Sequence, residues 1–215
     1  VNMGPKRDIL AEWERAARKH KLPYGVSIHS SHAWTWYETG QAADKKGPYA
    51  GISYDARVVR KEDGKGKWWE GYDPEELYVQ NHSLSGHAWG VWDWPEGTSV
   101  PTQAYYDNFF DRTIDMINKY NPDLVYFDDS VLPFYPIDNT GLDVVAHYYN
   151  HNMKQNKGKL NAVVFGKKLE GLHKEALVWD VEKGVPSEGQ DKPWQTCSCL
   201  GTWHYNRSTY VDNWY

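Results

Sequence analysis

Short apolar segments alternate along this chain with longer segments of helical periodicity. Residues 24–28, 124–127, 161–165 and 176–180 are brief and nearly continuously apolar, and they are separated by stretches such as 101–120, where apolar residues recur every three or four positions. Strands that are buried on both faces have this composition, which is typical of a parallel sheet covered by helices. The pattern therefore predicts an α/β fold.

Three segments have the spacing of amphipathic helices, namely 6–20, 101–120 and 141–158. A last strand is expected within 193–206. The segment 40–70 is rich in Gly and Lys with few apolar residues, so we expect it to run over the surface. The apolar stripes consist of Ile9, Leu10, Trp13, Ala16 and Ala17 in the first helix and Phe109, Thr113, Met116 and Ile117 in the second.

Residues whose side chains could take part in catalysis follow the predicted strands. His29 and His32 come after the first strand, Asp128 and Asp129 after the second, and Glu182 after a later one. Both a TIM barrel and a doubly wound sheet place their sites at the carboxyl ends of strands. A doubly wound sheet would favour a Gly-rich phosphate loop, and the chain contains no G-x-G-x-x-G or G-x-x-x-x-G-K-[ST] motif. We therefore prefer a (β/α)8-like TIM barrel.

The aromatic composition points to a class of ligand. The chain has 12 Trp and 16 Tyr but only 5 Phe, and Tyr and Trp offer flat apolar faces with a polar group. A carbohydrate or another polar ring suits a binding site lined by such residues, and a Trp-rich core is an equally good interpretation.

The charge and hydropathy of the chain exclude two other classes of ligand. The net charge of -5 indicates no basic surface for nucleic acid, and no apolar run is long enough for a membrane helix. Cys197 and Cys199 are predicted to be free thiols.

Four segments follow one another along the chain, and they read MGPKRDIL, GVSIHSSHAWTW, YNPDLVYFDD and PWQTCSCLGTWHYN. In this order and rough spacing they resemble family 29 glycoside hydrolases, the α-L-fucosidases, and the resemblance covers essentially the whole chain. It implies a (β/α)8-like barrel followed by a β-sandwich, and hydrolysis of terminal α-L-fucose with retention of configuration. The expected partner is a fucosylated oligosaccharide or glycoconjugate, with no cofactor or metal. We expect a secreted, periplasmic or lysosomal-type compartment.

The chain also departs from the family pattern. Nothing matches the family's upstream His-rich strand end, and the sequence stops at Tyr215, before the family's sandwich. We therefore expect residues 1–215 to be a single section of the catalytic domain that contains part of the barrel. A barrel glycosidase for another sugar, and a carbohydrate-binding protein on a decayed hydrolase barrel, are the alternative functions.

The resemblance places the catalytic nucleophile at Asp128, where an ionised carboxylate must attack the anomeric carbon and later leave. Its neighbour Asp129 should point to the other side of the strand and bind loop amides or a helix N-terminus. The alternative is that both carboxylates form a solvated strand end or a helix cap.

Glu182 is the candidate acid/base, because it follows an apolar strand and resembles the family's ERG segment. Its carboxyl group should then lie about 5–5.5 Å from the nucleophile. The rival positions are Glu188, Glu170 and Asp180.

Histidines and aromatic residues near these carboxylates are the candidates for sugar binding. A histidine at a strand end can donate to sugar hydroxyls, although a structural histidine is the commoner case, and the H-x-x-H pair lacks a third metal ligand at suitable spacing. For each aromatic residue, core packing is an equal alternative. The predicted substrate-binding residues are His29, His32, Trp34, Trp36, Tyr126 and Trp203.

Overall fold

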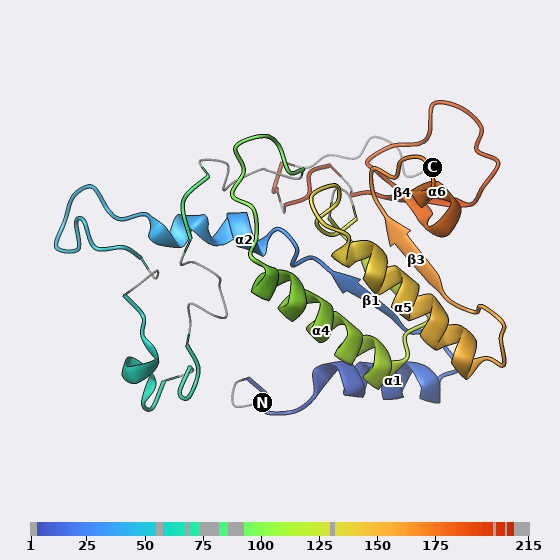
Figure 1. Ribbon diagram of the computed structural model, residues 1–215, viewed down its shortest axis with the longest axis horizontal. Coiled ribbons are helices and arrows are strands. Elements are labelled where there is room, and N and C mark those ends of the chain that lie inside the picture. Colours follow the sequence, from blue (N-terminus) through green and yellow to red (C-terminus); the bar gives the residue numbers. More distant parts are fainter. Residues whose placement is uncertain are drawn as a thin grey trace.

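Five strands form a single parallel sheet whose order in space follows the sequence, β1-β2-β3-β4-β5 (Figure 1). The computed structural model describes residues 4–54, 58–67, 69–73, 82–85, 93–129, 132–199, 201–204 and 206–208. The strands are β1 (Gly25–Ile28), β2 (Leu124–Phe127), β3 (Val163–Gly166), β4 (Val178–Glu182) and β5 (Trp194–Cys197). The α/β prediction and its parallel strands are therefore confirmed, with shifts of one or two residues at their ends.

The three predicted amphipathic helices are present with slightly shorter bounds. Helix α4 ends where Asn121 adopts a left-handed backbone conformation, with Pro122 directly after it, a sequence that commonly stops a helix. Short helical segments that the periodicity did not predict lie between the main elements. The helices are α1 (Ile9–Lys19), α2 (Ala33–Trp36), η1 (Tyr37–Gln41), η2 (Lys61–Gly64), α4 (Gln103–Tyr120), α5 (Thr140–Gln155) and α6 (His173–Ala176).

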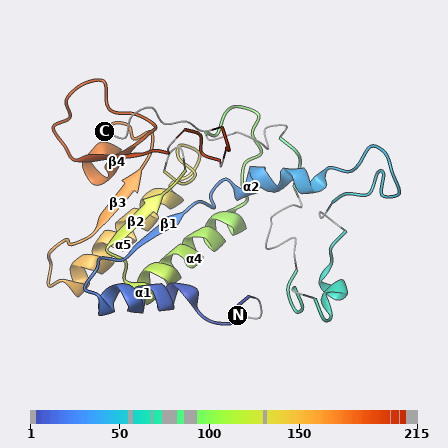
Figure 2. The same ribbon diagram turned by 180° about the vertical axis from the view of Figure 1, so that it is seen from behind.

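Helices α4 and α5 cover one face of the sheet, which we call the helix face (Figures 1 and 2). Alternate strand residues point into this layer, so Val125, Phe127 and Val164 are each completely buried. Ile117 of α4 and Val144 of α5 are buried in the same core. Burial of such side chains, each worth roughly 1.5–3 kcal/mol, stabilises this layer.

The other face of the sheet, which we call the open face, carries the intervening residues. Ser27, Tyr126, Phe165 and Val178 are neighbours in register across β1 to β4 and point to this side. Strands β1, β2 and β3 lie in front of the helices when the molecule is seen from this side (Figure 2). Because side chains alternate along a strand, the residues just beyond the strand ends also divide between the two faces.

Helix α1 differs from the prediction in its packing. None of its residues is buried, and Trp13 is 67% exposed. The helix is held by polar contacts, since Arg18 pairs with Asp123 before β2, and the Tyr24 hydroxyl donates to the Leu10 carbonyl. Its apolar stripe borders a hollow of about 600 Å³ against β1. Periodicity predicted the helix correctly but could not show what lies against its apolar side.

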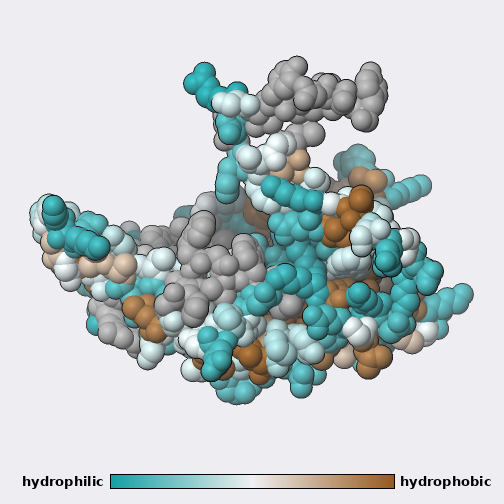
Figure 3. All heavy atoms as spheres, turned by 90° about the horizontal axis from the view of Figure 1, so that it is seen from above, coloured by the Kyte–Doolittle hydropathy of each residue, from teal (hydrophilic) through white to brown (hydrophobic). Residues whose placement is uncertain are grey.

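The described parts of the long connection between α2 and α4 extend away from the sheet, as the composition of residues 40–70 predicted (Figure 1). Several contacts join this connection to α2 and η1. Buried Glu38 accepts hydrogen bonds from the Ser85 backbone and hydroxyl, and the His82 ring lies 2.9 Å from the Trp34 carbonyl. Seen from above, the described surface is mostly hydrophilic, with hydrophobic residues in small separate patches (Figure 3). Within the described residues, the helices are too short or too polar to span a bilayer.

Candidate active site

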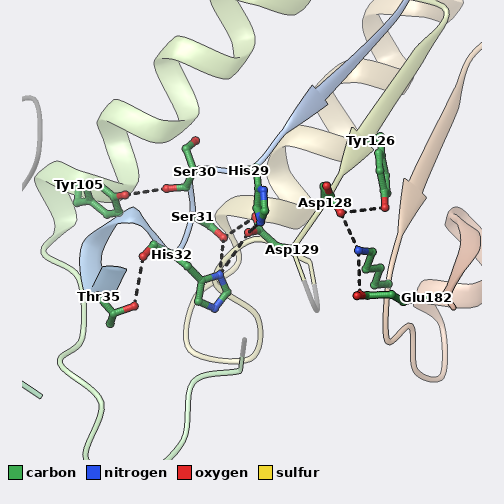
Figure 4. Close-up of polar contacts among 11 residues, drawn as sticks. His29, Ser30, Ser31, His32, Thr35, Tyr105, Tyr126, Asp128, Asp129 and Glu182 are labelled. Carbon is green, nitrogen blue, oxygen red and sulfur yellow. Dashed lines mark hydrogen bonds and ion pairs between the residues drawn. The ribbon is translucent and has the colours of Figure 1, made fainter. Parts of the chain in front are cut away.

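The two adjacent aspartates after β2 point to opposite sides of the strand (Figure 4). The Asp128 amide donates to the Ile28 carbonyl at 3.0 Å, so the strand geometry continues one residue beyond Phe127. Asp128 therefore shares the open face with Tyr126, whereas Asp129 turns back towards the segment after β1. Adjacent carboxylates avoid each other's charge because the pleat separates them.

Asp128 is held through one of its two carboxylate oxygens. The Tyr126 hydroxyl donates to Oδ1 at 3.0 Å, and the Lys167 ammonium lies 2.7 Å from the same atom. Within the described part of the chain, Oδ2 has no hydrogen-bond partner. The side chain of Asp128 is 34% exposed, so its carboxylate is partly accessible to a ligand on the open face.

Lys167 joins Asp128 to Glu182. Its Nζ atom lies 3.1 Å from Glu182 Oε2, and its side chain is only 13% exposed. Burial alone would lower the lysine pKa, but hydrogen bonds to the two carboxylates outweigh it and raise the pKa above its usual value. Lys167 directly follows β3 and continues the register in which Phe127 faces Gly166, so it stands beside Asp128. It is therefore a permanent cation between two acids.

Tyr126 links Asp128 to a third carboxylate. Its hydroxyl also lies 2.6 Å from Asp180 Oδ2, and Asp180 is 1% exposed. Burial, together with the hydrogen bonds to Asp180 and Asp128, raises the Tyr126 pKa well above its usual value. The half-buried Cys197 of β5 completes this group, with its sulfur 3.9 Å from the Tyr126 hydroxyl and its pKa raised by burial. Cys197 and Cys199 are both free, as predicted.

Asp129 is completely buried and belongs to a separate polar cluster. The Ser31 hydroxyl donates to its Oδ2 at 2.7 Å, while Nδ1 of His32 lies 3.4 Å and Nε2 of His29 lies 3.9 Å from its Oδ1 (Figure 4). The prediction that Asp129 faces away from Asp128 is confirmed. Its partners, however, are side chains of the segment after β1 and not loop amides or a helix N-terminus.

The model of the alpha-L-fucosidase family matches residues 1–215, the whole chain. The chain belongs to the alpha-L-fucosidase family. A search of curated proteins gave no match. Membership supports glycoside hydrolase activity on fucose.

His29 and Trp36 are the predicted sugar-binding residues at the end of β1 that remain accessible. His29 is 42% exposed and meets the edge of Trp36 at a centroid distance of 4.9 Å. Trp203 is also exposed, and the Lys183 ammonium lies 4.8 Å from its ring centroid. His29 and Trp36 thus offer a hydrogen-bonding ring and an apolar surface at the end of β1, next to β2.

Two predicted sugar-binding residues lie in the interior of the protein. His32 is 0% exposed and stacks on Trp94, while Trp34 is 3% exposed and stacks on His82 at 4.1 Å. The sequence prediction for these two residues is corrected, because neither side chain is accessible to a sugar in this structure. Both follow β1 and looked equivalent to His29 in sequence, but the turn into α2 directs them inward.

The rival acids are distributed differently around the open-face carboxylates. Glu188 and Glu170 are exposed, and among the described residues neither contacts Asp128 or Lys167. Asp180 lies in the site but is buried behind Tyr126. Glu182 is 49% exposed and is the acid that shares Lys167 with Asp128.

Lys167 is the site residue that the sequence analysis missed. A lysine after a short strand is usually a solvated surface residue, so its identity alone gave no signal. Its position was informative, because Lys167 follows Phe165 by two residues just as Asp128 follows Tyr126. No group of three His, Cys, Asp or Glu side chains in the described ranges has the arrangement of a metal site.

Proposed function

We propose that this protein hydrolyses terminal α-L-fucose from glycans by a retaining, double-displacement mechanism. The observation that carries the proposal is the shared contact of Asp128 and Glu182 with one ammonium group, at 2.7 and 3.1 Å. These two distances together are shorter than the roughly 6.5 Å that separates the carboxyl groups of an inverting pair at the least. This close approach supports a retaining pair over an inverting one.

In the first step, Oδ2 of Asp128 attacks the anomeric carbon while the bond to the leaving oxygen breaks. Glu182, in its protonated form, donates its proton to that oxygen. Oδ1 of Asp128 stays bound to Tyr126 and Lys167, which keeps the carboxylate oriented. In the second step, Glu182 takes a proton from water, and the water oxygen replaces Asp128 at the anomeric carbon with net retention.

His29 and Trp36 support the fucose specificity of the proposal. The imidazole of His29 is available to sugar hydroxyls, and the half-buried Trp36 ring beside it is an apolar surface for the sugar's methyl group. The exposed Trp203 is a further candidate for contact with the glycan. Because the substrate is a glycan, we propose a secreted, periplasmic or lysosomal-type location.

We further propose that the sheet is part of a (β/α)8-like barrel. The strand order β1-β2-β3-β4-β5 is sequential, and α4 and α5 lie on the same face. A doubly wound sheet reverses its strand order and carries helices on both faces, whereas a barrel has sequential strands with helices outside. On this view the open face is the interior of the barrel, which is where the catalytic residues of such enzymes emerge.

The proposal is tested by following an aryl α-L-fucoside with the wild-type protein and with Asp128→Ala. We expect turnover by the wild type, release of α-L-fucose as the first product in an NMR time course, and loss of turnover in the variant. Asp115→Ala on the exposed side of α4 is the matched control and should keep wild-type activity. Binding of fucosides without turnover by the wild type would instead support a carbohydrate-binding protein.

The acid/base role is tested with leaving groups of different acidity. Glu182→Ala should slow substrates with poor leaving groups far more than activated aryl fucosides, because only the former need protonation. Azide should restore part of the turnover by replacing the water that Glu182 activates. Equal losses on both substrates would move the role to Glu188, Glu170 or Asp180.

A further inference from the structure

Lys167 contacts both catalytic carboxylates, yet neither nucleophilic attack nor proton donation uses an ammonium group. Its Nζ atom lies 2.7 Å from Asp128 Oδ1 and 3.1 Å from Glu182 Oε2, and the side chain is largely buried. A buried cation in this position changes the free energy of every state in which one of the carboxylates gains or loses charge. The free enzyme and the covalent intermediate of a retaining reaction differ in which of the two carboxylates is charged.

We propose that Lys167 is a charge-stabilising residue that accelerates the second step, the hydrolysis of the fucosyl-enzyme. The inference rests on the proposed retaining function. In the free enzyme ready for reaction, Asp128 is ionised and Glu182 holds a proton, so the ammonium neutralises Asp128. In the covalent intermediate, Asp128 is a neutral ester and Glu182 is ionised, so the same ammonium neutralises Glu182. The three groups keep a net charge of zero throughout.

The contact with Asp128 opposes the first step and favours the second. An ammonium against Oδ1 stabilises the carboxylate in the ground state, which makes it a weaker nucleophile. When water attacks the anomeric carbon, the bond from that carbon to Oδ2 breaks, and its electron pair returns to the carboxylate. The negative charge then develops next to Nζ of Lys167, which stabilises the departing group.

The contact with Glu182 positions the base of the second step. In the second step, a proton of the attacking water passes to Glu182, which must be ionised to accept it. Lys167 donates a hydrogen bond to Glu182 Oε2 at 3.1 Å, which holds this carboxylate beside Asp128. The Tyr126 hydroxyl, the other donor to Asp128 Oδ1, is neutral and has no contact with Glu182 among the described residues. Among the side chains that the structure describes, Lys167 is therefore the one that contacts both carboxylates.

The neighbouring residue provides a matched control. Lys168 has the same side chain and the next position in the sequence, but its ammonium pairs with exposed Asp93 at 2.8 Å, and its own side chain is 55% exposed. Lys167→Met and Lys168→Met thus make the same chemical change, one inside the site and one outside it. Lys167→Arg keeps the positive charge, and Lys167→Gln removes it while keeping a polar side chain.

The test is pre-steady-state kinetics with an activated aryl α-L-fucoside, whose leaving group needs no proton. In Lys167→Met we expect the second step to slow about 10²-fold, while the first step changes much less. The trace should show a burst of one aryl group per enzyme followed by slow turnover, and mass spectrometry should detect the enzyme carrying one fucosyl group. Lys168→Met should behave like the wild type, and Lys167→Arg should recover most of the second-step rate.

Two results would overturn the inference. One is an equal slowing of burst and turnover in Lys167→Met, which is the signature of a structural role. The other is wild-type kinetics in Lys167→Met or Lys167→Gln. If Lys167→Met does not fold, the comparison of Lys167→Gln with Lys167→Arg carries the same test. Absence of fucoside turnover in the wild type would instead refute the proposed function itself, and this inference with it.

Discussion

The two faces of the same sheet have opposite chemistry. On the helix face, Val125 and Phe127 are completely buried against α4 and α5. On the open face, the alternate positions Tyr126 and Asp128 belong to a network of hydroxyl, carboxylate and ammonium groups. Because side chains alternate along a strand, β2 stabilises the fold with one set of residues and provides the site with the other. Mutations one position apart should therefore affect different properties.

The largest expected effect is on activity and lies on the open face. Asp128→Ala should lower kcat by at least about 10⁴-fold, because a covalent mechanism without its nucleophile loses most of its rate enhancement. The free energy of unfolding should stay near that of the wild type, since the side chain is partly exposed and Lys167 keeps Glu182 as a partner. Enzyme assays and urea unfolding of the same preparation measure both. If the variant lost stability along with activity, the open face would contribute to the fold as well as to the site, and the proposed difference between the two faces would be contradicted.

The reverse result is expected at the preceding position. Phe127→Ala removes a completely buried ring from the helix face and should lower the free energy of unfolding by about 3–5 kcal/mol. At a temperature where the variant is folded, we expect its kcat to fall far less than that of Asp128→Ala. Urea unfolding followed by circular dichroism gives the stability change. A loss below about 1 kcal/mol would show that this layer contributes little to stability.

Asp129 should behave as part of the structural framework despite its chemical identity with Asp128. Asp129→Ala leaves the Ser31 hydroxyl and the His32 ring without their buried acceptor, and we expect a loss of about 1–3 kcal/mol in stability. The His29 ring also approaches Asp129, so the apparent KM for fucosides should rise as well. Thermal unfolding and Michaelis–Menten kinetics test this pair of effects. Unchanged stability with activity lost as completely as in Asp128→Ala would exchange the roles of the two aspartates.

The smallest expected effect is on stability, at the edge of the helix layer. Asp8 caps α1 and pairs with Lys119 of α4, and the Lys119, Ala11 and Tyr120 hydrogen bonds hold its pKa well below the usual value. A depressed pKa means that its stabilisation is present above the unfolded-state value near 3.8 and is lost as pH falls through the folded-state pKa. Because the pair is exposed, the effect should be modest.

The check for Asp8 is the difference in melting temperature between the wild type and Asp8→Ala as a function of pH. We expect a small, constant difference at neutral pH that shrinks in strongly acidic solution. A difference that grows as pH falls would contradict the direction of the pKa shift.

The sequence predicted those parts of the fold that depend on local periodicity. Strands such as 124–127 and helices such as 101–120 were found because spacing along the chain determines which residues can share a face. The opposite directions of Asp128 and Asp129 followed from the same rule. The exposed stripe of α1 did not, since periodicity describes one element and not what packs against it.

The site was predicted less completely, because its members meet through tertiary contacts. Lys167 and Asp128 are adjacent only because β2 and β3 pair in a particular register. His32 and Trp34 were assigned to the sugar site by their proximity to His29 in sequence, and the turn into α2 buries both. Residues at strand ends were therefore easier to place than residues in the loops that follow.

The most direct test of the open face as a retaining active site is to trap the covalent intermediate. A 2-deoxy-2-fluoro-fucosyl fluoride should react and accumulate, because the fluorine slows both steps while the good leaving group permits the first. Peptide mapping by mass spectrometry would then locate the label. The proposed function predicts a single fucosyl ester on Asp128, absent from Asp128→Ala. A label on Asp180 or Glu182, or normal fucoside turnover with no label at all, would contradict it.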